Sequence, residues 1–322
     1  MRKHNTIVSV LMLTYNHEKY VETAIKSILC QKTNFCFELL IGEDCSTDNT
    51  RQIVIEYGNK NPDIIRTFLS VKNVGAIENE KKLMEMAQGK YIAFCEGDDY
   101  WTDEHKLQKQ VDFLESNPDY GLVHGDTNLL NASSGELIKA YNKSKGIKIP
   151  EGDIFRNLMT PSHIIKTMTV CFNKALFEKY YLSDTQIMNK DWRLIDISIW
   201  LMIARHSKIH YFNEVFATYR LLPESMSRSR NPRKLYEFHK SIFDIKKYFL
   251  KIFNNNIEIE KSIYTSHYKF LLSDAYAMND YKLANKVFLI LKSNNIDISL
   301  KEKIMFLAVK YPFVRYLINI VK

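Results

Sequence analysis

Three acidic side chains follow an apolar run in the stretch YIAFCEGDDYW, residues 91–101. They are Glu96, Asp98 and Asp99, and their like charges repel one another in a loop where a single Asp or Gly would make an ordinary turn. Divalent cations prefer hard oxygen ligands, and Mg²⁺ binds through one or two carboxylates together with substrate phosphates. The adjacent aspartates therefore predict a site for Mn²⁺ or Mg²⁺ at which a diphosphate supplies the remaining oxygens. The alternative is that they cap a helix that begins near Asp103.

Two further polar loops carry side chains suited to a nucleotide. In the segment TYN, residues 14–16, the ring of Tyr15 can stack on a base. In the segment EDCSTDN, residues 43–49, the carboxylate of Asp44 can accept a hydrogen bond from a base N–H. Each loop taken alone is equally typical of a turn, because Thr, Asn, Asp and Ser are common turn formers. Together with the acidic loop they indicate groups for a base, a ribose and a metal-bound diphosphate.

The elements that must position these loops alternate between strand and helix. Short apolar runs end just before each loop, and a segment with helical spacing of apolar residues follows each one. This alternation occurs four times in about the first hundred residues and predicts a doubly wound α/β sheet. In such sheets ligands bind outside the carboxyl ends of the strands, where all three loops lie. The predicted strands are 7–13, 37–42, 64–71 and 90–95.

The remainder of the chain predicts a helix at 103–116 and a strand beginning at Tyr120. Residues 208–221, KIHYFNEVFATYRL, are expected to form two short strands around Asn213–Glu214. The C-terminal part is expected to be helical throughout. Its predicted helices are 235–253, 257–279, 281–293 and 299–321.

Composition indicates a globular chain with an uneven charge distribution. Of the 322 residues 46% are hydrophobic and 25% are charged, as in ordinary soluble domains. The five cysteines form no CxxC pair, so we expect buried thiols in a reducing compartment, without zinc or disulfides. No signal peptide and no membrane-spanning run is evident.

Residues 223–322 carry 18 Lys or Arg against 9 Asp or Glu, whereas residues 1–222 carry 27 against 28. The sequence thus predicts a near-neutral domain at 1–222 and a basic α-helical domain at 223–322. The amphipathic last segment favours either peripheral contact with an anionic membrane or packing onto the rest of the chain. We expect no nucleic-acid partner, because the excess charge lies away from the strand-end loops and no reading motif is present.

The quoted loops carry a family resemblance. VSVLMLTYNHEKYVETAIKSILCQ, FELLIGEDCSTDNT and GKYIAFCEGDDYW, followed by DEHKLQKQVDFLESNP, resemble a bacterial glycosyltransferase of family 2. The resemblance runs from about Ile7 to Arg220. It implies a GT-A fold, a doubly wound mixed sheet followed by an α-helical C-terminal region. It also implies sugar transfer from a nucleotide diphosphate donor, usually with inversion and with a divalent metal.

Carried over by position, the resemblance gives each loop a role. Thr14, Tyr15 and Asn16 would line the nucleotide-base pocket, and Asp44 would hydrogen-bond the base. Asp98 would face the ribose or sugar, and Asp99 would hold the metal together with Asp98.

The resemblance also implies a general base that deprotonates the acceptor hydroxyl. In the family this Asp precedes an apolar helix that leads to a KI-x-Y strand and a Tyr-Arg dipeptide. LIDISIWLMIARHSKIHYF followed by ATYRLL fits that pattern and places the base at Asp196, with Asp191 in NKDW as the runner-up. Trp101 and His163 border the implied sugar and acceptor sites. The chain lacks the His that many relatives have two residues after the arginine of that dipeptide.

The leading hypothesis is an inverting, metal-dependent glycosyltransferase that uses a nucleotide sugar, with UDP favoured. Its acceptor would be a glycan or a lipid-linked glycan in bacterial surface polysaccharide synthesis, such as O-antigen of lipopolysaccharide or capsule. Its location would be cytoplasmic, at the inner face of the cell membrane. The alternatives are a sugar nucleotidyltransferase and a non-catalytic nucleotide-sugar binding protein.

Overall fold

The computed structural model describes residues 6–160, 165–188, 190, 192, 194–223, 231–253 and 257–321. The chain divides into two compact units. The first comprises Met1–Leu158, His163–Lys190 and Ser198–Leu222, and the second comprises Met159–Ser162, Asp191–Ile197 and Pro223–Lys322.

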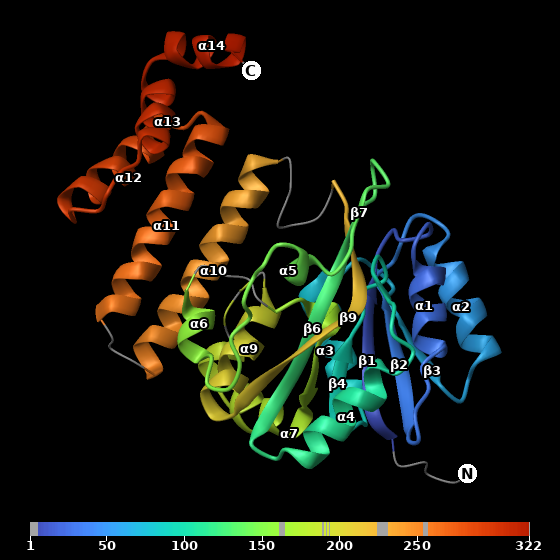
Figure 1. Cartoon of the computed structure of the whole chain (residues 1–322). Helices are drawn as coiled ribbons and strands as arrows, with labels where there is room; N and C mark the ends of the chain where they lie inside the picture. The colour runs from blue at the N-terminus through green and yellow to red at the C-terminus, as the bar shows by residue number, and fades with distance from the viewer. Residues whose placement is uncertain are drawn as a thin grey trace. The chain divides into compact units, whose positions relative to one another are not determined.

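The first unit is built on a nine-stranded mixed sheet (Figure 1). Its strands run in the order β3-β2-β1-β4-β8-β6-β9-β5, with β7 paired to β6 outside that path. The neighbours β3, β2, β1 and β4 are parallel, β8 is antiparallel to both β4 and β6, and β9 is parallel to β6 and antiparallel to β5. The bounds are β1 Thr6–Thr14, β2 Cys36–Glu43, β3 Ile65–Leu69, β4 Tyr91–Phe94, β5 Tyr100–Trp101, β6 Tyr120–Asn131, β7 Leu137–Ile138, β8 Cys171–Asn173 and β9 Lys208–Leu221.

Helices cover this sheet because its central strands are apolar on both faces. Val8, Val10 and Met12 of β1 are fully buried, and they share a core with Val21, Ile25 and Ile28 of the first helix. The helices and helical turns of this part are α1 Val21–Leu29, α2 Thr50–Lys60, α3 Ala76–Met86, α4 Lys106–Ser116, α5 Tyr141–Ser144, α6 Phe155–Met159, η1 Thr167–Thr169, α7 Lys174–Leu176, η2 Phe177–Leu182, α8 Thr185–Met188 and α9 Ile195–His206. The predicted α/β class is confirmed.

The second unit contains the helices α10 Pro232–Phe253, α11 Ile257–Met278, α12 Tyr281–Ser293, α13 Leu300–Lys310 and α14 Pro312–Val321. Helix α11 packs against α10, α12 and α13 (Figure 1). Leu272, Ala275, Ala284, Val287 and Leu291 form the centre of its apolar core. The predicted helical C-terminal region is confirmed. Among the described residues, no helix is both long enough and apolar enough to cross a bilayer.

Three expectations about local structure are wrong. Residues 208–221 form one strand, β9, because its pairing with β6 absorbs Asn213–Glu214 in a register shift between Gly125 and Asp126. The predicted helix 299–321 is two helices, because Pro312 lacks an N–H and holds Tyr311 in an extended conformation. The thiols are not all buried.

Cys95 and Cys171 are buried, but Cys30 and Cys36 are exposed and Cys45 is intermediate. The exposed pair lies at the two ends of the connection between α1 and β2, just outside the apolar runs that suggested burial.

Candidate functional site

The three predicted loops emerge side by side at one edge of the sheet. Thr14, the last residue of β1, lies opposite Glu43, the last residue of β2, in the parallel register. Beyond the strands, the Asp44 N–H donates to the Thr14 carbonyl at 3.1 Å. On the other side of β1, the Gly97 N–H donates to the Leu13 carbonyl at 2.9 Å, so the acidic loop continues alongside the end of β1. The sheet register therefore brings residues 14–16, 44 and 96–99 together.

The first two loops are fastened to each other by side chains. Asn16 adopts a left-handed backbone with φ of 55°, and its side-chain oxygen accepts from the Thr47 N–H at 2.9 Å. The Asn16 N–H in turn donates to Ser46 Oγ at 3.0 Å. The His17 N–H donates to Thr50 Oγ1 at 2.7 Å, at the start of α2. These bonds give Asn16 a structural role in holding the first two loops together, while Tyr15 is 42% exposed.

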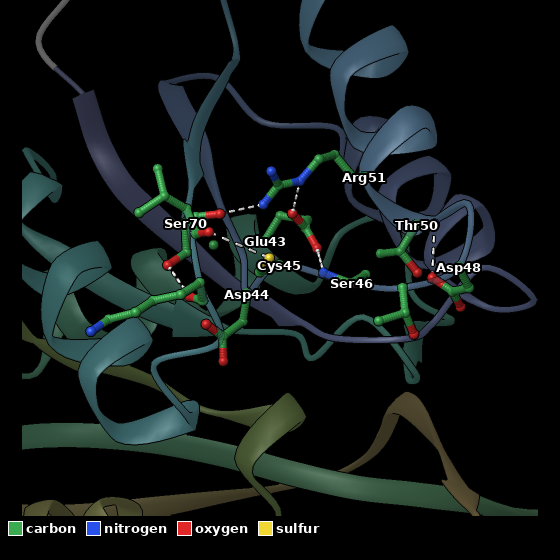
Figure 2. Close-up of polar contacts among 12 residues, drawn as sticks. Glu43, Asp44, Cys45, Ser46, Asp48, Thr50, Arg51 and Ser70 are labelled. Atoms are coloured by element: carbon green, nitrogen blue, oxygen red, sulfur yellow. Dashed lines mark hydrogen bonds and ion pairs between the residues drawn. The ribbon is translucent and has the colours of Figure 1, made fainter.

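An ion pair between a half-buried arginine and a buried glutamate anchors the second loop (Figure 2). Glu43 is fully buried, accepts from the Ser46 N–H at 2.6 Å and pairs with Arg51 of α2. Arg51 also donates to the Ser70 carbonyl after β3. The ends of β2 and β3 and the start of α2 are thereby held by one guanidinium. Neither residue was predicted to matter, although an Arg inside the helix that follows EDCSTDN was a visible signal.

Asp44 contacts backbone rather than solvent in this structure. Its carboxylate is 3% exposed, and its two oxygens accept from the N–H groups of Val74 and Gly75 at 2.7 and 2.9 Å. A carboxylate has about four lone-pair positions, so two of these remain for another donor. Asp44 thus fixes the loop before α3 and still presents acceptor capacity.

The two aspartates of the acidic loop have different environments. Asp98 is partly exposed, whereas Asp99 is 2% exposed and accepts from the Arg220 N–H at 2.8 Å. Burial raises the pKa of Asp99 well above its usual range, the charges of Asp98 and Glu96 raise it further, and hydrogen bonding and charge from Arg220 oppose the rise. The loop therefore holds one accessible and one buried carboxyl group.

Arg220, near the end of β9, fastens the acidic loop to that strand. Its guanidinium donates to the Asp98 carbonyl oxygen at 2.6 Å. It also lies over the rings of Tyr20 and Tyr100, at 5.0 and 4.6 Å from their centroids. Cation–π contacts of this kind contribute about 0.5–2 kcal/mol each. The Tyr-Arg dipeptide served in the sequence only to locate the expected general base. The contacts of Arg220 make this residue part of the candidate site.

Thr14 and His17 have side-chain atoms that lack a hydrogen-bond partner within the described part of the chain. These atoms, Thr14 Oγ1 and His17 Nδ1, are buried and lie against Gly97. A Cβ on Gly97 would come within 2.8 and 2.9 Å of them, so only Gly fits there. Burial lowers the pKa of His17, while the nearby charges of Asp98 and Asp48 act in the opposite direction. Unsatisfied buried polar atoms beside an accessible carboxylate are what a polar ligand would complete.

The other predicted site residues are placed differently. Trp101 belongs to the core, being 4% exposed with its indole N–H donating to the Met168 carbonyl at 2.9 Å, so it does not present a surface to a sugar here. Asp196 lies in the first turn of α9 and accepts from the N–H of Ile197 at 2.7 Å. Asp191 and His163 lie outside the described residues.

Within the described residues, no cluster of three or more His, Cys, Asp or Glu side chains could enclose a metal ion. This is compatible with a cation that takes one or two carboxylates and completes its shell with water and phosphate. The accessible carboxylate of Asp98 fits such a cation in ligand type.

Comparisons with known proteins identify the family and the fold. Residues 9–180, more than half of the chain, match the family described as glycosyl transferase family 2. An uncharacterized protein of Mycobacterium tuberculosis is 41% identical over 112 residues, which are 35% of this chain and 32% of that protein. The chain thus aligns with about a third of the length of the mycobacterial proteins that it matches.

Two further relatives align over most of their length. A Bacillus subtilis protein named "Putative teichuronic acid biosynthesis glycosyltransferase TuaG" is 30% identical over 71% of this chain and 85% of its own length. The Escherichia coli protein WfgD, a UDP-Glc:alpha-D-GlcNAc-diphosphoundecaprenol beta-1,3-glucosyltransferase, is 27% identical over 70% of this chain and 81% of its own length.

Solved structures share the fold. The structure of S. aureus TarS 1-349 with UDP-GlcNAc has a TM-score of 0.55 at 17% identity and covers 94% of this chain and 79% of that chain. The mannosyltransferase PcManGT from Pyrobaculum calidifontis, in complex with GDP-Man and Mn²⁺, has a TM-score of 0.57 at 15% identity and covers 99% of this chain and 88% of that chain. The fold is of the GT-A type, and by the extent of the family match the chain belongs to glycosyltransferase family 2.

Proposed function

We propose that this chain is an inverting, metal-dependent glycosyltransferase that moves a sugar from a nucleotide diphosphate donor to a glycan or lipid-linked glycan acceptor. The observation that carries the proposal is the meeting of three loops, with Tyr15, Asp44 and Asp98, at the carboxyl ends of adjacent strands. A nucleotide diphosphate has a base, a ribose and a pyrophosphate, and each loop offers groups suited to one of them. Family membership supports the same reaction class.

At the nucleotide end, Tyr15 stacks on the base through its exposed ring, and Asp44 accepts from a base N–H with its remaining lone pairs. Asn16 holds the loop that carries Tyr15, and Thr14 Oγ1 offers a hydrogen bond that no described residue uses. A carboxylate acceptor suits the imide N–H of uracil, which is the reason for favouring a UDP-sugar. The TarS complex with UDP-GlcNAc gives this choice indirect support.

At the pyrophosphate end, we assign the metal to the Asp98–Asp99 loop. The resemblance gave the metal chiefly to Asp99, but the burial of Asp99 favours Asp98 as the side chain that reaches the ion and Asp99 as the group that positions the loop. When bound, a divalent cation would neutralise the charge that develops on the departing diphosphate. Arg220 keeps the Asp98 backbone in place for this role.

For the acceptor, we propose Asp196 as the general base, with Asp191 as the alternative. Inversion requires the acceptor hydroxyl to attack the anomeric carbon while it loses its proton, and a positioned carboxylate can take that proton. The support is the order of segments in the sequence, an Asp at the start of an apolar helix that leads into β9. His163 remains a candidate for a sugar or acceptor contact.

For the pathway, we propose surface polysaccharide synthesis at the cytoplasmic face of the cell membrane. TuaG is named for teichuronic acid biosynthesis, and WfgD is named for a diphosphoundecaprenol-linked acceptor. Because the chain aligns with TuaG and WfgD over 71% and 70% of its length, we propose an acceptor of the same class. We also propose residues 1–222 as the transferase domain, with the basic helical region at 223–322 as a separate domain.

The first prediction concerns donor and metal together. Calorimetric titration of the whole chain with a series of UDP- and GDP-sugars should give heat for one donor in the presence of Mn²⁺, and chelation with EDTA should abolish it. Asp98→Asn should weaken this binding at least about tenfold, because loss even of a group that only orients a metal ligand lowers metal affinity by about that factor. The exposed Asp63→Asn is the matched control and should bind as the wild type does.

Heat from a nucleoside triphosphate with a sugar phosphate, in place of a nucleotide sugar, would contradict the proposal and favour a nucleotidyltransferase. Donor binding without release of nucleoside diphosphate in the presence of any acceptor would favour a binding protein.

The second prediction is that Asp99→Asn stabilises the fold at neutral pH. Burial raises the pKa of Asp99 in the folded protein above the value of about 4 that Asp has in the unfolded chain. The protonated side chain therefore stabilises the fold fully at pH values below the unfolded pKa. This stabilisation is lost as the pH rises through the folded pKa. Asn does not titrate and keeps an oxygen for the Arg220 N–H. The variant should melt higher than the wild type near pH 7 and equally below the unfolded value. A lower melting temperature at pH 7, measured beside Asp63→Asn, would refute this account.

The third prediction is that Arg220→Lys lowers kcat/KM at least about tenfold and weakens Mn²⁺ affinity. Lysine cannot both stack between Tyr20 and Tyr100 and donate to the Asp98 carbonyl, because it lacks the planar guanidinium. Arg156→Lys, at an exposed position on α6, should leave both quantities unchanged. Wild-type metal affinity in Arg220→Lys would mean that the loop does not depend on this contact.

The fourth prediction separates the two candidate bases. Asp196→Asn should keep donor binding by calorimetry and lose turnover by about a hundredfold or more, the usual contribution of a general base. Asp191→Asn should keep turnover. Asp184→Asn is the control, because Asp184 also accepts backbone N–H bonds at the start of a helix, α8. If Asp191→Asn is the inactive variant, the base is Asp191, and if neither is inactive, the proposed mechanism fails.

A further inference from the structure

Helices α13 and α14 present apolar side chains that the second unit does not cover. Phe306, Ala308 and Val309 of α13 are buried in the core shared with α11 and α12. Other large side chains of the two helices are 39–73% exposed. They are Leu300, Ile304, Leu307, Tyr311, Phe313, Tyr316 and Leu317. We call these seven residues the outer apolar set.

The outer apolar set follows helical spacing. Leu300, Ile304 and Leu307 recur along α13 at intervals of four and three, so they lie on one face of that helix. On α14, Tyr316 and Leu317 lie three and four residues after Phe313, so these three side chains also share one face. A surface helix normally has one apolar face toward the core and a polar face toward solvent. A second, exposed apolar face is therefore unusual.

Arg315 keeps α14 on the unit while these side chains remain exposed. Its guanidinium donates to the Tyr276 carbonyl and to Asn279 Oδ1, both at 2.9 Å, and lies over the Tyr276 ring at 4.8 Å. A cation at the C-terminal end of α11 is also favoured by the helix dipole. Arg315 thus holds α14 against α11. Phe313, Tyr316 and Leu317 are exposed although their helix is fixed in this way.

The charges beside the outer apolar set have one sign. Lys301, Lys303 and Lys310 are exposed. Within residues 300–317 the acidic side chain is Glu302, which caps α13 with Ser299 and pairs with Lys269 at 3.5 Å. Among the described residues none of the three exposed lysines forms an ion pair, and Lys310 lies over the Tyr311 ring at 5.1 Å from its centroid. Exposed aromatic and leucine side chains next to such lysines are typical of helices that lie in the interface of an anionic membrane.

We propose that the α13–α14 surface, formed by the outer apolar set with Lys301, Lys303 and Lys310, binds the interface of a bilayer containing anionic lipid. The apolar side chains enter the acyl boundary, and the lysines pair with lipid phosphates. A second copy of the chain fits less well, because a twofold contact would bring two surfaces of net positive charge together. The proposal is independent of the sugar-transfer chemistry, since it concerns neither donor nor acceptor residues.

The test is co-sedimentation of the full chain with vesicles of phosphatidylcholine alone and with vesicles in which about a third of the lipid is phosphatidylglycerol. The wild type should partition at least about tenfold more strongly onto the anionic vesicles, and high salt should weaken that binding. Phe313→Ser/Tyr316→Ser/Leu317→Ser and Lys301→Glu/Lys303→Glu/Lys310→Glu should each lower partition at least about tenfold. Val71→Ser/Leu289→Ser is the matched control, since Val71 and Leu289 are 93% and 57% exposed outside this surface, and it should bind as the wild type does.

A second readout does not depend on the variants' folding. Tyr316→Trp, used with the wild type as background, should show a blue shift of emission with anionic vesicles. Equal binding by the wild type and both triple variants, or equal binding to neutral and anionic vesicles, would overturn the proposal. So would a dimer in light scattering that the serine variant abolishes, because the surface would then be a contact between copies.

Discussion

The candidate site depends on the parallel register of β2, β1 and β4. Because side-by-side parallel strands end at the same edge of a sheet, the residues after Thr14, Glu43 and Phe94 emerge together, although they are about 30 and 50 residues apart in the sequence. The Asp44 and Gly97 N–H groups extend the ladder by a residue or more beyond the strands. A slip of the register would therefore displace all three loops at once. Most of the side-chain contacts described for Asn16, Asp44 and Glu43 serve to hold the loops in that arrangement.

The two neighbouring carboxyl groups at this edge of the sheet differ in exposure. Asp99 is buried and its pKa is raised, Asp98 is partly exposed, and Arg220 contacts the loop through both its backbone N–H and its guanidinium. Further inside, Lys106 is fully buried over the Trp101 ring, and burial lowers its pKa to about 8. Burying several ionisable groups so close together lowers the stability of the fold, because each group loses its hydration. Such buried groups are typical of sites where function, rather than stability, selects the residues.

The sequence predicted the parts of the fold that repeat a simple pattern. Apolar runs followed by polar loops predicted four strands, and the structure places their ends at one edge of the sheet. The order of the strands within the sheet was not predicted, and the roles of Tyr15, Asp44 and Asp98 stay predictions. What the sequence could not supply were contacts between distant segments. The two tyrosines that enclose Arg220 lie 200 and 120 residues from it, so no local spacing reveals them. The burial of Trp101 and Asp99 is likewise not visible in local sequence, because it is decided by the segment around Met168 and by β9, which contact them.

The Glu43–Arg51 pair supports the loop after β2 from residues that lie apart from the exposed Tyr15. Arg51 joins two strand ends and a helix start without using Tyr15, whose ring stays exposed. The support of this loop therefore does not depend on the exposed ring of Tyr15. A substitution at Tyr15 would leave the contacts of Arg51 with Glu43 and Ser70 in place, whereas loss of Arg51 would release the ends of two strands together.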